Sequence, residues 1–257
     1  MATEYGRAGV LGMLTPQANT TVEPEFRALL PPDWAMINAR LTSARGSIEE
    51  RLVDYADRFA ETCGQFANAP LSAIAIGCTG ASYLIGREAE ARILAGIEAR
   101  HGVPVYSAAT AVVAAMRALA ARRIGLVSPY PEGLDAACAA YWEGHGLTVT
   151  AKAAVGAETA AFHPIYAMAG AACLDALRSL QGGDCEAVIL LGTGMPTLAP
   201  LLAVAGRGGP PAISCNLALA WAACDGARAE TLPAWIAGAG WGDRLARLYP
   251  AALGAET

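Results

Sequence analysis

The chain has 257 residues, of which 54% are hydrophobic and 16% charged, and its formal net charge is −5. This composition excludes a disordered chain, and the length is enough for one large domain or two small ones, each with a sizeable core. No basic cluster is longer than Arg122 and Arg123, which argues against a nucleic-acid partner. Since no apolar run reaches the roughly 18 residues of a membrane span and no signal-peptide pattern opens the chain, we expect a cytoplasmic protein with no membrane partner.

Short apolar runs alternate along the chain with stretches of helical periodicity. The runs are continuous, end in Gly, Pro, Ser or Thr, and are typical of strands buried on both faces of a parallel sheet. They cover residues 11–16, 73–77, 104–107, 124–129, 187–192 and 211–214. The helical stretches cover residues 48–66, 88–99, 108–120, 134–143 and 168–180, and Ser47 with Glu50 forms a capping box before the first. This alternation predicts βαβ crossovers with helices on both faces of the sheets.

The chain contains an internal repeat. Residues 73–84 align without gaps on residues 187–198, an offset of 114 residues, and residues 11–16 align on residues 124–129 at nearly the same offset. A looser pair sets residues 104–107 against residues 211–214. Because the matched segments are separated by nearly the same number of residues, they indicate a duplicated unit.

We therefore predict an α/β fold of two pseudo-symmetric parallel-sheet halves, Rossmann-like or flavodoxin-like, with the active site between them. The first half is expected at residues 1–119 with the tail at 222–257, and the second at residues 120–221. In open parallel sheets ligands bind beyond the carboxyl ends of the strands. The loops at residues 15–21, 78–82, 128–133 and 192–197 should thus face one another around a pocket.

The cysteines number seven and include no CxxC pair, so we expect neither disulfides nor a bound metal. Most lie in Ala-rich stretches, where cysteine is usually a small buried hydrophobe. Cys78 differs because it follows a predicted strand directly and precedes a Thr79-Gly80 turn. Backbone amides and a helix N-terminus at that point would lower the pKa of its thiol from about 8.5 toward neutrality. The competing interpretation is that Cys78 merely fills the end of a strand.

The loop after the first strand, residues 14–25, is rich in amide and hydroxyl groups. Asn19 there is a candidate donor to a substrate carboxylate, although local sequence favours it as the cap of a helix that starts near Thr20. Glu23 and Glu25 are expected to complement a helix N-terminus rather than act as acids.

Tyr130 lies between two prolines, a rigid setting that suits a positioned hydrogen-bond donor, although packing at a domain junction is the competing interpretation. His101 and His145 each precede a glycine after a helical stretch and indicate C-terminal caps. His163 is the histidine placed in a candidate pocket-lining loop, and histidine is often merely structural.

These residues resemble the aspartate/glutamate racemase superfamily, in particular its branch of maleate cis-trans isomerases and arylmalonate decarboxylases. Residues 16–25 are similar to the isomerases' substrate loop, Gly77-Cys78-Thr79 matches their first catalytic cysteine, and Ser128-Pro129-Tyr130 matches a loop whose tyrosine binds a carboxylate. The region from Trp241 to Leu245 is a looser match. The resemblance implies cofactor-independent chemistry on a small carboxylate or dicarboxylate, and a possible homo-oligomer. It makes Cys78 catalytic. Together with the strand-end loops it leads us to expect substrate binding by Pro16, Asn19, Thr79, Gly80, Tyr130, Gly192, Thr193 and Gly194, and His163 is added from its place in the candidate pocket-lining loop alone.

The chain departs from the family pattern at Gly192, which stands where the superfamily has its second cysteine. Racemisation by two opposed thiols is therefore not expected. One thiol suffices for two reactions: addition of Cys78 to an activated double bond, rotation and elimination, which is cis-trans isomerisation, or protonation by Cys78 of an enediolate left by decarboxylation. We rank isomerisation first. Decarboxylation would give a product of opposite handedness to that from a cysteine at the second position. A non-catalytic carboxylate-binding protein, or another lyase or hydrolase that uses Cys78, is a further alternative.

Overall fold

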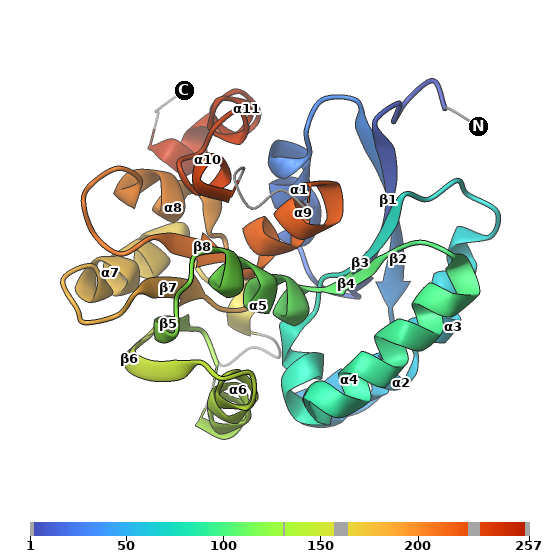
Figure 1. The fold of residues 1–257 in the computed structure, drawn as a ribbon, viewed down its shortest axis with the longest axis horizontal. Coiled ribbons are helices and arrows are strands. Elements are labelled where there is room, and N and C mark those ends of the chain that lie inside the picture. Colours follow the sequence, from blue (N-terminus) through green and yellow to red (C-terminus); the bar gives the residue numbers. More distant parts are fainter. Residues whose placement is uncertain (1–2, 131, 157–163, 226–231, 255–257) are drawn as a thin grey trace.

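Two four-stranded parallel sheets lie side by side in the structure, a computed structural model that describes residues 3–130, 132–156, 164–225 and 232–254 (Figure 1). The first sheet has the order β2-β1-β3-β4 and the second the order β6-β5-β7-β8. The strands are β1 (Gly9–Pro16), β2 (Trp34–Leu41), β3 (Ala73–Ile76), β4 (Val105–Ser107), β5 (Arg123–Ser128), β6 (Thr148–Ala154), β7 (Ala187–Leu190) and β8 (Ala212–Ser214). The α/β fold with two pseudo-symmetric parallel-sheet halves is confirmed.

The two sheets repeat each other in register as well as in strand order. Leu11 of β1 pairs with Ala73 of β3, and the residues aligned with them by the internal repeat, Ile124 of β5 and Ala187 of β7, pair in the same way. The sequence repeat therefore reflects a structural duplication. The strand order matches the start of the flavodoxin-like order, in which ligands bind where neighbouring crossovers diverge.

Helices cover the faces of both sheets. Those that follow the strands of the first sheet are α1 (Val22–Leu29), α2 (Ile48–Asp57), α3 (Phe59–Thr62), α4 (Thr79–His101) and α5 (Ala108–Ala118), with the 3₁₀ turn η1 (Cys63–Phe66). The rest are α6 (Glu132–Gly144), α7 (Gly170–Leu180), α8 (Leu198–Val204), α9 (Cys215–Asp225), α10 (Leu232–Ile236) and α11 (Trp241–Leu248), with the turns η2 (Pro164–Ala167) and η4 (Pro250–Leu253).

One helix prediction was wrong: the stretch predicted as one helix over residues 48–66 is broken into α2, α3 and η1. The helix predicted over residues 88–99 lies in the part of α4 that follows Gly86, where a φ of +74° separates two helical segments. The first of these segments, which begins at Thr79, was not predicted. The capping box of Ser47 and Glu50 at the start of α2 is confirmed.

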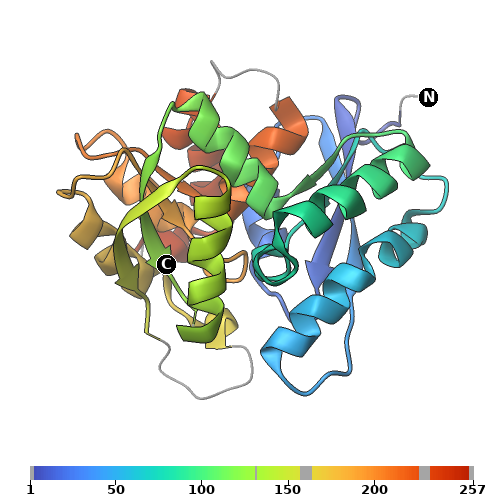
Figure 2. The same cartoon turned by 60° about the horizontal axis from the view of Figure 1, so that its bottom comes forward.

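Helices α5 and α9 pack against each other between the two sheets, and α9 also contacts strands of both (Figure 1). The C-terminal helix α11 lies on α1 and α8, and the Arg244 guanidinium donates to the carbonyls of Ala28, at 2.6 Å, and Leu29, at 3.0 Å. Figure 2 shows the two sheets, each with its own helices, as two lobes. The division into residues 1–119 with 222–257 and residues 120–221 stays a prediction.

Among the helices of the described ranges, none has the length and apolar character required to cross a bilayer.

Candidate active site

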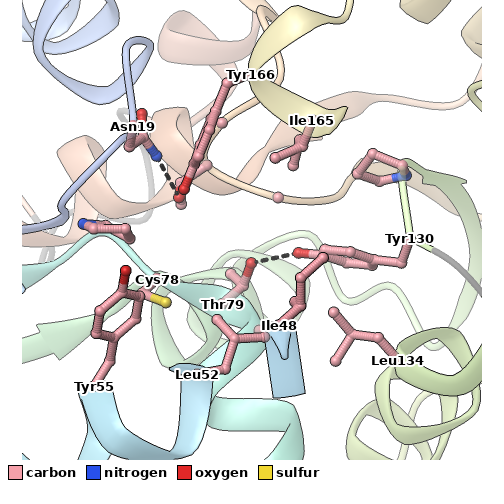
Figure 3. Close-up of a pocket in the computed structure, with 16 residues that line it drawn as sticks. Asn19, Ile48, Leu52, Tyr55, Cys78, Thr79, Tyr130, Leu134, Ile165 and Tyr166 are labelled. Carbon is pink, nitrogen blue, oxygen red and sulfur yellow. Dashed lines mark hydrogen bonds between the residues drawn. The ribbon is translucent and has the colours of Figure 1, made fainter. Parts of the chain in front are cut away.

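A pocket with a cavity volume of about 70 Å³ lies between the two halves, at the carboxyl ends of β1, β3, β5 and β7. Its small size suits a compact ligand, because drug-sized sites have volumes of several hundred Å³. Nine of the ten residues selected from sequence line it: Pro16, Asn19, Cys78, Thr79, Gly80, Tyr130, Gly192, Thr193 and Gly194. The tenth, His163, lies outside the described residues. Figure 3 shows the side chains converging on the pocket from both halves.

Cys78 is held at the junction between β3 and α4. The Gly77 amide donates to the Leu14 carbonyl at 2.8 Å, which extends the ladder by one residue beyond β3. Cys78 then adopts extended backbone, with φ −148° and ψ 94°, as the N-cap of α4. Its side chain is 3% exposed, so the thiol sits beneath the first-turn amides at the edge of the pocket.

The expectation that this thiol is close to ionisation is wrong. Burial raises the pKa of Cys78 to about 12, and the Ala81 amide, which lowers it, only partly opposes that effect. The physical reason is that removing a thiolate from water outweighs the stabilisation by one backbone donor. Cys78 is therefore a neutral thiol at pH 7, and its proton must be moved when the sulfur acts as a nucleophile.

Thr79 and Tyr130 join the two halves across the pocket. Their hydroxyl oxygens lie 2.8 Å apart, as the dashed line in Figure 3 marks. Burial raises the pKa of Tyr130 well above 10, and the bond to Thr79 opposes this shift. Both groups are thus neutral, and they offer hydroxyl protons to a carboxylate or an enediolate without carrying charge themselves.

Asn19 accepts hydrogen bonds from amides at the start of α1, close to the capping role that the local sequence indicated, although the N-cap residue itself is Thr21. Its Oδ1 accepts from the Thr21 amide at 2.8 Å and from the Val22 amide at 3.0 Å, at the start of α1. Its Nδ2 donates to the Thr193 Oγ1 at 3.3 Å. The side chain therefore both ends the first loop and links it to the second half, while one amide proton stays available at the pocket.

The loop around Thr193 is fastened to the first half by two further bonds. The Thr193 hydroxyl donates to the Gly77 carbonyl at 2.7 Å, next to Cys78, and the Thr21 hydroxyl donates to the Gly194 carbonyl at 2.7 Å. Since loops from both halves are cross-linked, the backbone amides at the two strand ends keep fixed positions around one small volume. Such preorganised donors suit the stabilisation of an oxyanion.

Gly192 occupies the place of the second thiol and leaves no room for one. Its φ is +79°, in the region that favours glycine, and a Cβ there would lie 2.6 Å from Ile165 Cδ1 and 3.3 Å from the Tyr130 hydroxyl. Hydrocarbon from Ile165 therefore fills the space into which a side chain at residue 192 would project.

The remaining wall of the pocket is apolar, and no residue that lines it within the described ranges carries a formal charge. Ile48 and Leu52 come from α2, Leu134 comes from α6, and Ile165 comes from η2. The pocket thus combines neutral hydrogen-bond donors on one side with hydrocarbon on the other. This arrangement suits a carboxylate that carries a compact apolar part.

Sequence reasoning missed Tyr55 and Tyr166, which both line the pocket. Tyr55 belongs to α2, and its position one turn after Leu52 and two turns after Ile48 indicates only a buried helical face. Tyr166 belongs to η2 and packs over Gly194, where a Cβ would come within 2.5 Å of its ring. For Tyr166 the available signal was its place in the candidate pocket-lining loop of His163. For Tyr55 no sequence signal separates it from ordinary core residues, because what distinguishes it is the pocket itself.

A larger hollow, about 1000 Å³, lies between α1, α7, α8 and the C-terminal segment, and none of the described residues that line it is a cysteine. Its buried acid, Glu25, accepts from the Thr197 amide at 2.5 Å, the Leu198 amide at 3.2 Å and Asn216 Nδ2 at 2.7 Å. Glu25 therefore complements a helix N-terminus, as expected, but that of α8 in the other half. The smaller pocket, which holds the thiol, is the candidate active site.

A family model described as arylmalonate decarboxylase matches residues 11–238 of the chain. The chain is 30% identical over 242 residues to a maleate isomerase from Nocardia farcinica, covering 90% of this chain and 93% of that one. A crystal structure of the maleate isomerase Iso from Pseudomonas putida S16 superposes with a TM-score of 0.74 at 22% identity, covering 83% of this chain and 90% of that one. A cysteine-to-serine mutant of the Nocardia farcinica maleate cis-trans isomerase, with a covalently bound succinylcysteine intermediate, superposes with a TM-score of 0.73 at 26% identity, with the same coverage.

Proposed function

Because the chain belongs to the arylmalonate decarboxylase family, we propose that it is a cofactor-independent cis-trans isomerase of small unsaturated carboxylic acids of the maleate type, with Cys78 as its nucleophile. The observation that carries this proposal is the thiol of Cys78 in a small pocket between the halves, beside hydroxyl and amide donors from both. The substrate-binding roles of Asn19, Thr79, Tyr130 and Thr193 are part of the same proposal.

The Nocardia farcinica mutant supports a mechanism with one thiol. In that protein a succinyl group is bound to a cysteine although another cysteine has been replaced by serine. Addition of sulfur to the double bond therefore needs no second thiol there. In this chain residue 192 is glycine, and among the described residues that line the pocket Cys78 is the cysteine.

The reaction would proceed in three steps. The Cys78 sulfur bonds to one carbon of the double bond as the π bond breaks, and a hydrogen that replaces the thiol proton is added to the neighbouring carbon, which leaves a single bond. Charge that develops on the adjacent carboxylate during this step is stabilised by the hydroxyls of Thr79 and Tyr130 and by amides at Gly80 and Gly194. Rotation about the single bond, followed by loss of the sulfur and of a proton from the neighbouring carbon, releases the trans acid and regenerates the Cys78 thiol.

Decarboxylation of a malonate-type acid is the second candidate, and two observations favour it. The thiol of Cys78 is neutral, which suits a proton donor better than a nucleophile. The wall of Ile48, Leu52, Leu134 and Ile165 would accommodate an apolar substituent on the substrate. Cys78 would then protonate the enediolate left after carbon dioxide departs.

Incubation of the purified chain with maleate and, separately, with phenylmalonate, followed by NMR, distinguishes the isomerase from the decarboxylase. Fumarate formation supports the isomerase, phenylacetate formation supports the decarboxylase, and either activity should be lost in Cys78→Ala. If neither acid is converted by the wild-type chain, the proposed function is wrong and a carboxylate-binding protein becomes the better explanation.

We further propose that the substrate is a dicarboxylate and that the protein works in the cytoplasm without nucleic-acid or membrane partners. The neutral lining of the pocket means that both carboxylates would be held by hydrogen bonds alone. Size-exclusion chromatography with light scattering tests the possible homo-oligomer.

A further inference from the structure

Tyr55 carries a buried hydroxyl at the pocket. Its side chain is 1% exposed, and no hydrogen bond of standard geometry joins its oxygen to a described residue, although the Gln17 backbone and the Arg51 side chain lie close to it. Buried hydroxyls are nearly always paired, so one without a hydrogen bond of standard geometry calls for an explanation. Tyr55 lines the pocket, and Figure 3 shows its hydroxyl turned toward the side of the pocket where the sulfur of Cys78 lies.

The surroundings of Tyr55 keep its hydroxyl protonated, and the neighbouring Cys78 thiol is protonated as well. Burial raises the pKa of Tyr55, and the nearness of Cys78 raises it further, while Arg51 and the backbone of Gln17 lower it. Tyr166 also interacts with it electrostatically. A phenol beside a thiol can accept the thiol proton on its oxygen while it gives up its own.

The chemistry of the proposed function requires such a proton transfer. A thioether adduct forms when the double bond gains both the Cys78 sulfur and a hydrogen on the neighbouring carbon. The thiol begins protonated, residue 192 supplies no second thiol, and no described residue that lines the pocket is charged. Among the described residues that line the pocket, a neutral hydroxyl is thus the group that can relay this proton.

We propose, on the basis of the proposed function, that the Tyr55 hydroxyl is a catalytic proton relay between Cys78 and the substrate carbon. As the sulfur–carbon bond forms and the π bond breaks, the Tyr55 proton passes to the neighbouring carbon and the thiol proton passes to the Tyr55 oxygen. After rotation about the carbon–carbon bond, Tyr55 takes a proton from that carbon, returns its own to the departing sulfur, and a double bond forms again. Atoms and electrons balance without an oxidant or a reductant.

The geometry of this relay predicts an isotopic signature. Because Tyr55 and Cys78 act from the same side, hydrogen and sulfur add to one face of the double bond and leave from one face. Removal of the hydrogen that was added regenerates the cis acid. The trans acid forms only when the carbon–carbon bond first rotates by one third of a turn and the hydrogen that was originally on that carbon is then removed. The hydrogen that the relay added therefore remains in the product.

The test is conversion of maleate by the wild-type chain in deuterated water, followed by NMR of the fumarate. The relay predicts one vinylic deuterium in each fumarate molecule formed. Fumarate without deuterium would overturn the relay while leaving the isomerase assignment intact, whereas absence of fumarate would contradict the isomerase assignment itself.

The matched variants are Tyr55→Phe and Tyr106→Phe. Tyr106 lies on β4 outside the pocket, so its replacement removes one phenol hydroxyl from the same half without touching the site. For Tyr55→Phe we expect kcat to fall by about 10²- to 10³-fold with KM within threefold, and the residual fumarate to lose its deuterium. Tyr106→Phe should match the wild type. An unchanged kcat, or a change confined to KM, in Tyr55→Phe with native circular dichroism would contradict the proposal.

Discussion

At the scale of single residues, Cys78 is the reactive group of the proposed mechanism, although its side chain is almost completely buried. Its thiol borders a pocket, yet the side chain is 3% exposed and burial raises its pKa to about 12. A neutral thiol is a weak nucleophile by itself, because the thiolate is the reactive form. The site must therefore activate the sulfur only when a substrate and a proton acceptor are both in place.

This protonation state predicts how Cys78 reacts with iodoacetamide. Since the pKa lies near 12, the thiolate fraction, and with it the rate of alkylation, should rise about tenfold per pH unit from pH 7 to pH 10 without reaching a plateau. Peptide mass spectrometry at a series of pH values measures the rate at this residue. A plateau near pH 8 would mean that the amides at the start of α4 outweigh burial after all.

The conformation and surroundings of Gly192 prevent the site from containing a second thiol at this position. A second cysteine there would be in a left-handed conformation and would collide with Ile165. We expect Gly192→Cys to lower the free energy of unfolding by about 2 kcal/mol or more, from the unfavourable φ together with the collision. The double variant Gly192→Cys with Ile165→Ala should regain part of this loss, because only the collision is relieved.

Urea denaturation of both variants measures these changes. If the single variant were as stable as the wild type, the pocket would tolerate a second thiol, and the packing of Ile165 would not account for its absence.

At the scale of elements, the two halves are joined by the packing of α5 on α9 and of α4 on α6, and also by hydrogen bonds at helix and strand ends. Glu25 of α1 complements the start of α8, and Thr193, which follows β7, bonds to Gly77 after β3. Each link connects a loop of one half to an element end of the other. Because these same loops line the pocket, the stability of the junction and the geometry of the site are coupled.

Glu25 and Glu23 offer a matched pair for this coupling. Glu25 is buried with its carboxylate bonded to Thr197, Leu198 and Asn216, whereas Glu23 forms a half-exposed ion pair with Arg40. Glu25→Ala leaves buried donors unpaired, so we expect a loss of about 3 kcal/mol in the free energy of unfolding. Glu23→Ala should lose less than about 1 kcal/mol.

Thermal and urea unfolding of the two variants test this difference. Equal losses would contradict the view that Glu25 fastens the two halves together.

At the scale of the whole molecule, the sequence predicted the duplicated fold because buried parallel strands leave a strong signal. The runs at residues 73–77 and 187–192 are continuous and apolar, and six of the described strands were found in this way. β2 and β6 were missed because they are edge strands made largely of half-buried and exposed residues, whereas the edge strands β4 and β8 keep short buried runs. β6 alternates between half-buried and exposed positions and contains no apolar run.

The candidate site was predictable where residues follow strand ends, and unpredictable where helices contribute its walls. Cys78, Thr79, Tyr130 and Gly192 were found because loops at the carboxyl ends of parallel strands converge. Tyr55, Leu52 and Leu134 were missed because they sit on helical faces that look like ordinary core. The ionisation of Cys78 was misjudged since sequence reveals the nearby amides but not the depth of burial.

The buried thiols also make the free energy of unfolding of the whole molecule depend on pH in the alkaline range. Burial raises the pKa of Cys63 to about 11 and those of Cys78, Cys138, Cys173 and Cys215 to about 12, above the value near 8.5 expected in the unfolded chain. A group whose pKa is raised on folding stabilises the fold fully below its unfolded pKa, and that stabilisation is lost as the pH rises. We therefore expect the free energy of unfolding to fall above pH 9, by up to about 1.4 kcal/mol per pH unit for each such thiol.

Urea titrations between pH 7 and pH 10.5, with a reductant present, measure this decline. A free energy of unfolding that stays constant across this interval would show that the thiols ionise equally in the folded and unfolded chains.

The central claim is that Cys78 bonds covalently to the substrate during turnover. The most direct measurement is an acid quench of the wild-type chain while it converts maleate, followed by proteolysis and peptide mass spectrometry. The account predicts a peptide containing Cys78 that has gained the mass of one maleic acid. An adduct on a different cysteine, or fumarate formation that proceeds unchanged in Cys78→Ser, would contradict it.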